Sequence, residues 1–335
     1  MSRIPSIEEF AKDVIVKEAS SKAGGVLSLQ KEHNMVPDIE VTVVTVCFNL
    51  LSAGRRELFL KNLDSVQAQE GVRLEHLIID GGSSDGTFEW VMGYNNTKYN
   101  IRVLSKPDSG IYDAMNRGIA LAQGKYIIFL NSDDYFHDSR GMVVSAERIE
   151  ELKCDFSFAP IRFNDFSIRH NPQLNPQKRL YRFIISWCFS HQTMLASRSL
   201  LLRLDGFETS YKSAADYDLL LRMIVAGAKG CFVPLTFATF STGGFSEDNY
   251  EIAVDECIFS LQKFYKNFYS VEMSYQEAKY IFTYRVYPSK YIDIYKHSQK
   301  LIRERFIGVP KGPVAWFSRW FNYLKYYQKC RKANI

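Results

Sequence analysis

Two adjacent carboxylates follow a short apolar segment in the first half of the chain. Asp133 and Asp134 come just after residues 126–130, a run of apolar residues that reads as a buried strand. Mg²⁺ and Mn²⁺ prefer oxygen ligands and are often held by one or two carboxylates together with the phosphates of a substrate. The pair therefore indicates a divalent-metal site. The alternative is a polar turn that caps the helix that follows.

A second carboxylate lies at the end of another apolar run. Asp80 closes residues 76–80 and is followed by Gly81 and Gly82, which allow the backbone to approach a ligand closely. A carboxylate in this place can accept a hydrogen bond from a nucleobase or a ribose. Residues 85–87 (Asp-Gly-Thr) read more plainly as a turn with a helix cap.

These strand ends belong to an alternation of strands and helices. The pattern predicts strands at 41–46, 74–80, 101–105 and 126–130, and helices at 55–69, 86–93 and 110–123. Short connections between them imply right-handed crossovers and a mainly parallel sheet. Ligands bind such sheets beyond the carboxyl ends of the strands, which here carry Phe48, Asn49, Asp80, Gly81, Asn131, Ser132, Asp133 and Asp134.

Length and composition narrow the class of protein. With 335 residues, 46% of them apolar, the chain can bury the core of one large domain or two modest ones, which excludes a disordered or collagen-like protein. No apolar run is long enough to span a bilayer, and no signal peptide is evident. The six cysteines are scattered without metal-ligand spacing, as in a reduced cytoplasmic protein. We therefore expect a cytoplasmic protein that is soluble or peripheral to the membrane.

Changes of composition and periodicity along the chain suggest three regions. Residues 1–38 form a polar extension with one predicted helix, 39–250 form the main domain, and 251–335 form a helical, basic and aromatic region. Segment 296–335 holds ten basic residues and one acid. Within 314–329, one helical stripe is formed by Trp316, Phe317, Trp320, Phe321, Leu324 and Tyr327. Such a helix suits an anionic membrane surface, and the alternative is packing on the main domain. No nucleic-acid-binding module is recognisable.

Seven short motifs together resemble the family 2 glycosyltransferases, which have the GT-A fold. In order, they are residues 45–49 (TVCFN), 79–87 (IDGGSSDGT), 108–116 (DSGIYDAMN), 130–134 (LNSDD), 190–192 (SHQ), 206–207 (GF) and 215–222 (ADYDLLLR). Their order and spacing fit as well as the motifs themselves, over roughly residues 40 to 245. The resemblance implies an α/β, Rossmann-like, mainly parallel sheet flanked by helices, with a C-terminal helical extension.

The resemblance also implies a nucleotide-sugar donor, here a UDP-sugar, with Mg²⁺ or Mn²⁺ on its diphosphate. Asp80 would contact the base or ribose, and Asp133 would bind the metal, with Asp134 as second choice. Many relatives carry an Asp where this chain has Asn131. The remaining residues of the donor site would be Thr45, Phe48, Asn49, Gly81, Asp113, Asn131, Ser132 and His191.

Asp216 is the candidate for the general base that deprotonates the acceptor hydroxyl. It begins a predicted helix over 216–226, and relatives usually carry Glu where this chain has Ala215. An ordinary helix cap is the alternative role, and Asp218 is the rival base.

The chain lacks the Q-x-x-R-W motif of processive synthases, so we expect transfer of single sugars with inversion. The acceptor would be a glycan or a lipid-linked molecule in cell-surface polysaccharide biosynthesis. The alternative is a nucleotide-binding or scaffolding protein without catalysis on the same fold.

Overall fold

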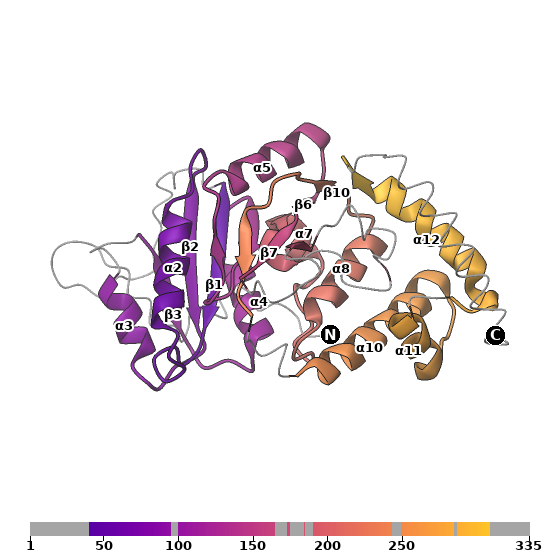
Figure 1. The fold of residues 1–335 in the computed structure, drawn as a ribbon, viewed down its shortest axis with the longest axis horizontal. Coiled ribbons are helices and arrows are strands. Elements are labelled where there is room, and N and C mark those ends of the chain that lie inside the picture. The colour runs from indigo at the N-terminus through magenta and orange to yellow at the C-terminus, as the bar shows by residue number, and fades with distance from the viewer. Residues whose placement is uncertain are drawn as a thin grey trace, which may run out of the picture.

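A computed structural model describes residues 40–94, 100–164, 173–174, 184, 190–242, 249–284 and 287–308. Its centre is an eight-stranded sheet with the order β12-β10-β6-β9-β4-β1-β2-β3 (Figure 1). These strands are β1 (Val41–Cys47), β2 (Leu74–Asp80), β3 (Arg102–Ser105), β4 (Tyr126–Phe129), β6 (Phe156–Phe158), β9 (Leu195–Ser197), β10 (Gly230–Phe232) and β12 (Phe306–Ile307). Only the pairs that β9 forms with β4 and β6 are antiparallel, so the predicted mainly parallel sheet is confirmed.

The central strand β1 is buried along its whole length, as its run of β-branched residues predicts. Val44 packs on one face of the sheet and Val43 on the other, in separate hydrophobic clusters. A Cβ added to Gly118 would lie 2.4 Å from Val44 Cγ1, so α4 can approach β1 this closely only with glycine there. Among the described residues, the helices before β6 are α2 (Arg56–Gln67), α3 (Thr87–Tyr94), α4 (Ile111–Leu121) and α5 (Gly141–Leu152). The predicted strands and the helices α2, α3 and α4 are confirmed to within a few residues.

A second, four-stranded sheet has the order β5-β11-β7-β8. Its strands are β5 (Tyr135–Phe136), β7 (Ile161–Phe163), β8 (Gln173–Leu174) and β11 (Ala238–Phe240). Because β4 belongs to the first sheet and β5 to the second, residues 130–134 cross from one sheet to the other. A short 3-10 helix, η2 (His191–Thr193), leads into β9, which lies directly beside β4. This topology brings the segments around residues 131 and 191 to the same edge of the main sheet.

The C-terminal helices lie at the end of the molecule opposite α3 (Figure 1). In the described part of the chain after β9, the helices are α7 (Arg198–Arg203), α8 (Ala215–Val225), α10 (Tyr250–Tyr269), α11 (Tyr275–Tyr284) and α12 (Ile292–Arg305), with the 3-10 turn η3 (Ser289–Tyr291). The predicted helix over 216–226 is α8. Helix α10 begins at the predicted division near residue 250, yet Leu261 and Phe282 share one hydrophobic cluster with Val44 of β1. The division into separate domains therefore stays a prediction.

The basic C-terminal segment begins inside this packed structure. Leu301 and Ile302 of α12 are buried in the same cluster. The Phe306 ring of β12 lies 6.1 Å from Phe156 and 5.4 Å from Phe158, measured between ring centroids. Segment 296–307 thus packs on the body of the protein.

Two sequence predictions fall outside the described residues. These are the helix in 1–38 and the aromatic stripe within 314–329. Within the described ranges, no helix is both long and apolar enough to cross a membrane. Binding of the tail to a membrane surface stays a prediction.

Candidate active site

A pocket of roughly 1190 Å³ opens beyond the carboxyl ends of β1 and β4, where the sequence predicts the ligand site. Its walls come from the ends of these strands, the start of α4, η2, the start of α8 and the start of α10. Of the predicted site residues, those that line it are Phe48, Gly81, Asp113, Asn131, Ser132, His191 and Asp216. The others, Thr45, Asn49, Asp80, Asp133 and Asp134, lie behind or beside this lining.

One end of the pocket suits a nucleobase. Phe48, at the end of β1, is 60% exposed, which offers a flat apolar face for stacking. Asp108 lies nearby, and a Cβ on Gly81 would be only 2.6 Å from its Oδ2 atom, so the glycine makes room for this carboxylate. Burial raises the pKa of Asp108, and its Oδ1 atom accepts the backbone N–H of Gly110 at 2.9 Å. Asp108 belongs to the motif at residues 108–116, but it is not among the site residues predicted from the sequence.

Asp80 shapes the turn after β2 from inside. It is 1% exposed, and its carboxylate accepts hydrogen bonds from the backbone N–H of Gly82 (3.2 Å) and Ser83 (3.0 Å) and from the hydroxyls of Ser83 (2.5 Å) and Ser105 (2.6 Å). These bonds fix the path of Gly81 along the pocket wall. In this arrangement Asp80 stabilises the turn that forms the pocket wall, and it does not itself line the pocket.

Three further predicted residues also have partners within the protein. Thr45 is buried, and its hydroxyl lies 3.0 Å from His76 Nε2. The Asn49 amide oxygen accepts the Ser84 N–H at 3.0 Å. Asp113 pairs with Arg117 at 2.9 Å while still lining the pocket. Thr45 and Asn49 therefore hold the wall, and Asp113 forms part of its edge.

The two adjacent carboxylates differ in their partners. Asp133 Oδ2 forms an ion pair with Arg55 Nη1 at 3.0 Å, and burial raises the pKa of Asp133 although Arg55 opposes this. Asp134 is 1% exposed and accepts the Ser241 N–H and the Gln192 side-chain N–H, each at 2.8 Å. Burial and the neighbouring Asp133 raise the pKa of Asp134 to about 7. Because both Asp134 oxygens are engaged, Asp133 is the better candidate metal ligand.

The turn that carries these carboxylates is held from below by Asn62 of α2. Its side-chain amide donates to the backbone carbonyls of Asn131 (2.9 Å) and Asp134 (3.0 Å), and the residue is fully buried. Asn62 could not be predicted from the sequence, because a polar residue within a helix carries no signal of a distant partner.

The residues present suit a metal that is bound jointly with a substrate. Among the described residues, no group of three or more His, Cys, Asp or Glu side chains could hold an ion by itself. Mg²⁺, however, is usually bound through one or two carboxylates and substrate phosphates, with waters filling the other positions. The carboxylate of Asp133, 13% exposed and beside Ser132 of the pocket lining, meets this requirement.

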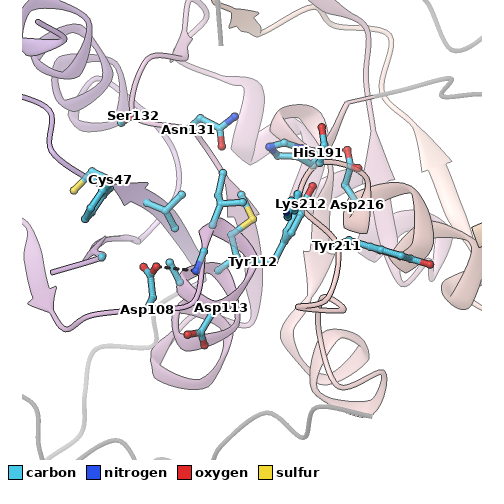
Figure 2. A pocket seen from close by; sticks show the side chains of 18 of the residues that line it. Cys47, Asp108, Tyr112, Asp113, Asn131, Ser132, His191, Tyr211, Lys212 and Asp216 are labelled. Atoms are coloured by element: carbon cyan, nitrogen blue, oxygen red, sulfur yellow. Dashed lines mark hydrogen bonds and ion pairs between the residues drawn. The ribbon is translucent and has the colours of Figure 1, made fainter. Parts of the chain in front are cut away.

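The opposite end of the pocket brings together His191 and Asp216 (Figure 2). Asp216 lies in the first turn of α8, and its Oδ2 atom is 3.4 Å from His191 Nδ1. Its Oδ1 atom accepts the Tyr217 N–H at 2.8 Å. The rival Asp218 is 5% exposed, forms an ion pair with Arg222 at 2.7 Å and does not line the pocket. Geometry therefore favours Asp216 over Asp218 for contact with a substrate.

A buried carboxylate from α10 supports the segment that leads into α8. Glu256 accepts the backbone N–H groups of Lys212 (2.6 Å), Ser213 (2.8 Å) and Ala214 (2.8 Å). A negative group near a helix N-terminus is favourable because of the helix dipole. Glu256 thus caps the chain just before Asp216. No local motif could reveal it.

Comparison with known sequences identifies the family. The sequence model described as "Glycosyl transferase family 2" matches residues 42–205. An uncharacterized glycosyltransferase of Mycobacterium tuberculosis is 30% identical over 201 residues, covering 54% of this chain and 68% of that protein. Hyaluronan synthase of Pasteurella multocida is 25% identical over 282 residues, covering 81% of this chain and 28% of the synthase. The chain thus spans little more than a quarter of the synthase.

Solved structures share the fold at low sequence identity. The structure of S. aureus TarS in complex with UDP superposes with a TM-score of 0.54 at 20% identity, covering 74% of this chain and 71% of that one. Mannosyltransferase PcManGT from Pyrobaculum calidifontis, in complex with GDP-Man and Mn²⁺, gives a TM-score of 0.51 at 16% identity, covering 91% and 86%. With the sequence match, the motifs and the pocket at the strand ends, these similarities show that the chain belongs to glycosyltransferase family 2 and has the GT-A fold.

Proposed function

We propose that this protein is an inverting, metal-dependent glycosyltransferase that moves a single sugar from a UDP-sugar to a glycan or lipid-linked acceptor in cell-surface polysaccharide biosynthesis. The observation that carries the proposal is the arrangement of one pocket. Cys47 and Asp108 lie at one end, Asn131 in the middle, and His191 with Asp216 at the other end (Figure 2). A donor can therefore lie along the strand ends, with its sugar between Asn131 and the His191–Asp216 pair.

The chain's own residues supply binding and orientation at the donor end. Phe48 offers a stacking face for the base, and the Arg55 guanidinium lines the pocket beside Asp133, where it can meet phosphate oxygens. Asp133 would hold Mg²⁺ or Mn²⁺, as the Mn²⁺ in the PcManGT structure suggests for the same fold. Such an ion, when bound, neutralises the charge that develops on a leaving diphosphate.

The choice of UDP and of a polysaccharide product rests on relatives. TarS binds UDP, and hyaluronan synthase is named for a polysaccharide. In inverting transfer the acceptor hydroxyl attacks the sugar carbon from the face opposite the diphosphate, which requires a base on that side. The His191–Asp216 pair lies on the acceptor side of the pocket in this arrangement. We infer a cytoplasmic enzyme at the inner face of the cell membrane.

Activity assays and calorimetry test the proposal together. We expect the full chain to bind UDP in the presence of Mn²⁺ and to hydrolyse or transfer from at least one nucleotide-sugar in a panel. Absence of both binding and turnover would refute the proposal. Binding of UDP without any turnover would instead favour a nucleotide-binding protein without catalysis.

A variant of the metal ligand sharpens the test. Asp133→Asn should weaken UDP binding in the presence of Mn²⁺ on the order of tenfold, equivalent to about 1.4 kcal/mol, and should change binding little without the metal. Asp293→Asn, at an exposed carboxylate of α12 that forms an ion pair with Lys296 at 3.1 Å, is the matched control. Equal UDP affinity of wild type and Asp133→Asn would show that Asp133 is not the ligand.

A further inference from the structure

The pocket has a lysine at the end where the acceptor must enter. Among the described residues of the lining, the Lys and Arg side chains are Arg55 and Lys212. Arg55 forms its ion pair with Asp133 at the donor end. Figure 2 shows Lys212 beside Asp216, at the end opposite Cys47. The positive charge of Lys212 therefore lies next to the acceptor side of the pocket.

No acid in the described part of the chain forms an ion pair with Lys212, whose side chain is exposed. Two acids of the elements around it have other partners. Asp218 of α8 forms an ion pair with Arg222 at 2.7 Å, and the Glu256 carboxylate accepts the three backbone N–H groups that precede α8. The ammonium of Lys212 is thus available to an anionic group of a ligand.

The backbone that carries Lys212 is held firmly on both sides. The Lys212 N–H donates to Glu256 at 2.6 Å, and the hydroxyl of the preceding Tyr211 accepts a hydrogen bond from Ser260 at 3.2 Å. A second ammonium group, Lys263 Nζ, lies 4.8 Å from the centroid of the Tyr211 ring, which itself lines the pocket. This wall therefore presents positive potential from a fixed place.

Exposed apolar side chains border the same end of the pocket. Of the large apolar residues that are exposed in the described ranges, Phe48, Ile111 and Tyr250 line the pocket. Phe48 belongs to the nucleobase end. Ile111, 41% exposed, begins α4, and Tyr250, 65% exposed, begins α10. A sugar ring has flat faces of C–H groups that can pack on such an aromatic ring, so Tyr250 offers a surface for an acceptor sugar.

We propose that the acceptor is an anionic sugar, whose ring carries a carboxylate or a phosphate group. Lys212 binds that group and Tyr250 packs on the ring; this inference rests on the proposed function. Apolar walls reduce the screening of charges, and an ammonium that donates to an anion forms a stronger hydrogen bond than a neutral pair. The acceptor hydroxyl is thereby held on the same wall as Asp216.

Three related sugars test the charge preference. Glucose, glucuronic acid and glucose 6-phosphate share one ring and carry a hydroxyl, a carboxylate and a phosphate at the same end. Their binding to the full chain is measured by NMR titration with UDP and Mn²⁺ present, so that the donor end is filled. At least one anionic sugar should bind about tenfold more tightly than glucose, equivalent to about 1.4 kcal/mol, and less tightly as salt is raised. The preferred sugar identifies a carboxylate or a phosphate as the group that is recognised.

Variants of Lys212 connect the preference to this side chain. Lys212→Gln should bind the three sugars equally, Lys212→Arg should keep the preference, and Lys212→Glu should reverse it, all with wild-type affinity for UDP. Lys279→Gln is the matched control, because Lys279 is an exposed lysine of α11 that also lies near a tyrosine ring, 5.6 Å from the centroid of Tyr275, but outside the pocket.

A variant of Tyr250 separates the ring contact from the charge contact. Tyr250→Ala should weaken the binding of all three sugars by a similar factor and leave their order unchanged. Tyr284→Ala, at a tyrosine of α11 that is 56% exposed and does not line the pocket, is the control and should bind them as the wild type does.

Each contrary result has a distinct meaning. Equal affinity of the wild type for the three sugars, or no measurable binding of either anionic sugar, would overturn the inference. Weakened UDP binding in Lys212→Gln, with the sugar preference intact, would place Lys212 on the donor and also overturn it. Turnover with an acceptor that carries no charge, with a KM that salt does not change, would overturn the inference while the proposed function stands. Absence of UDP binding and of turnover in the wild type would remove the proposed function itself.

Discussion

Replacing Glu256 by glutamine should loosen the chain that leads into α8. In the native protein, one oxygen of this carboxylate accepts the Lys212 N–H at 2.6 Å, and the other accepts the N–H groups of Ser213 and Ala214 at 2.8 Å. The amide of Glu256→Gln keeps only one acceptor oxygen. Its NH₂ group would face at least one backbone N–H, donor against donor.

The magnitude follows from this count. A hydrogen bond to a charged group contributes about 1.5–3 kcal/mol, and a negative charge at a helix N-terminus adds about 0.3–2 kcal/mol. Glu256→Gln loses one such bond and the charge, so the free energy of unfolding should fall by about 2–5 kcal/mol. Glu256→Ala leaves all three N–H groups without this acceptor and should cost more than Glu256→Gln.

The same substitution should act selectively on catalysis. The capped segment leads directly into Asp216, whereas the nucleotide end of the pocket is built on β1 and β2. We expect kcat to fall by up to ~10²-fold, since small displacements of reacting groups have effects of this size. UDP affinity should stay near that of the wild type.

Urea unfolding, steady-state kinetics and UDP calorimetry measure these three quantities. Glu251→Gln is the matched control, because Glu251 is an exposed carboxylate at the start of the same helix and should change stability by less than about 0.5 kcal/mol. If Glu256→Gln unfolds at the same urea concentration as the wild type and keeps its kcat, the capping argument is wrong.

Three further predictions concern the nucleobase end of the pocket, the buried core and the C-terminal tail. Phe48→Ala should weaken UDP binding by about 5- to 150-fold, because stacking on an aromatic ring contributes about 1–3 kcal/mol per base. Calorimetry measures this affinity, with Phe259→Ala, at an exposed aromatic residue of α10, as the control. Equal affinities of Phe48→Ala and the wild type would refute the prediction. Burial lowers the pKa of His76 to about 3. Between pH 6.5 and 3, His76 is therefore protonated in the unfolded state but not in the folded state, so the free energy of unfolding decreases as the pH is lowered. The loss from pH 7 to pH 5 should be about 2 kcal/mol by urea unfolding, and an identical pH slope in His76→Gln would contradict this. Deleting residues 309–335 should abolish salt-sensitive co-sedimentation with anionic vesicles while leaving the urea midpoint unchanged, and persistent binding would place the membrane contact elsewhere.

The sequence reveals the strands β1, β2, β3 and β4 of the main sheet because their signals are local. Strand β1 is buried on both faces, so apolar or β-branched residues are favoured at every position in 41–47 and not only at alternate ones. The abrupt change to polar residues at Asp80 and Asn131 marks the strand ends, and a parallel sheet brings such ends together. For the same reason the place of the pocket could be predicted before any side chain was located.

The contacts within the site depend on long-range packing and leave no such signal. His191 meets Asp216 because the three-residue strand β9 inserts antiparallel between β4 and β6, and a strand this short has no readable periodicity. Glu256 reaches the start of α8 only through the packing of α10 on α8. The inward turn of Asp80 likewise depends on Ser105 in the neighbouring strand β3.

Strand β12 has a consequence for how the chain folds during synthesis. It pairs with β10 at the edge of the main sheet, and Phe306 completes the aromatic cluster around Phe156 and Phe158. A chain that leaves the ribosome from its N-terminus will have made nearly the whole sheet before this strand emerges. Until then, the open edge of β10 offers unpaired backbone groups to any other nascent chain. The protein should therefore be most prone to aggregate during the part of translation that precedes the appearance of β12, and a chaperone that shields this edge should raise the yield of folded protein.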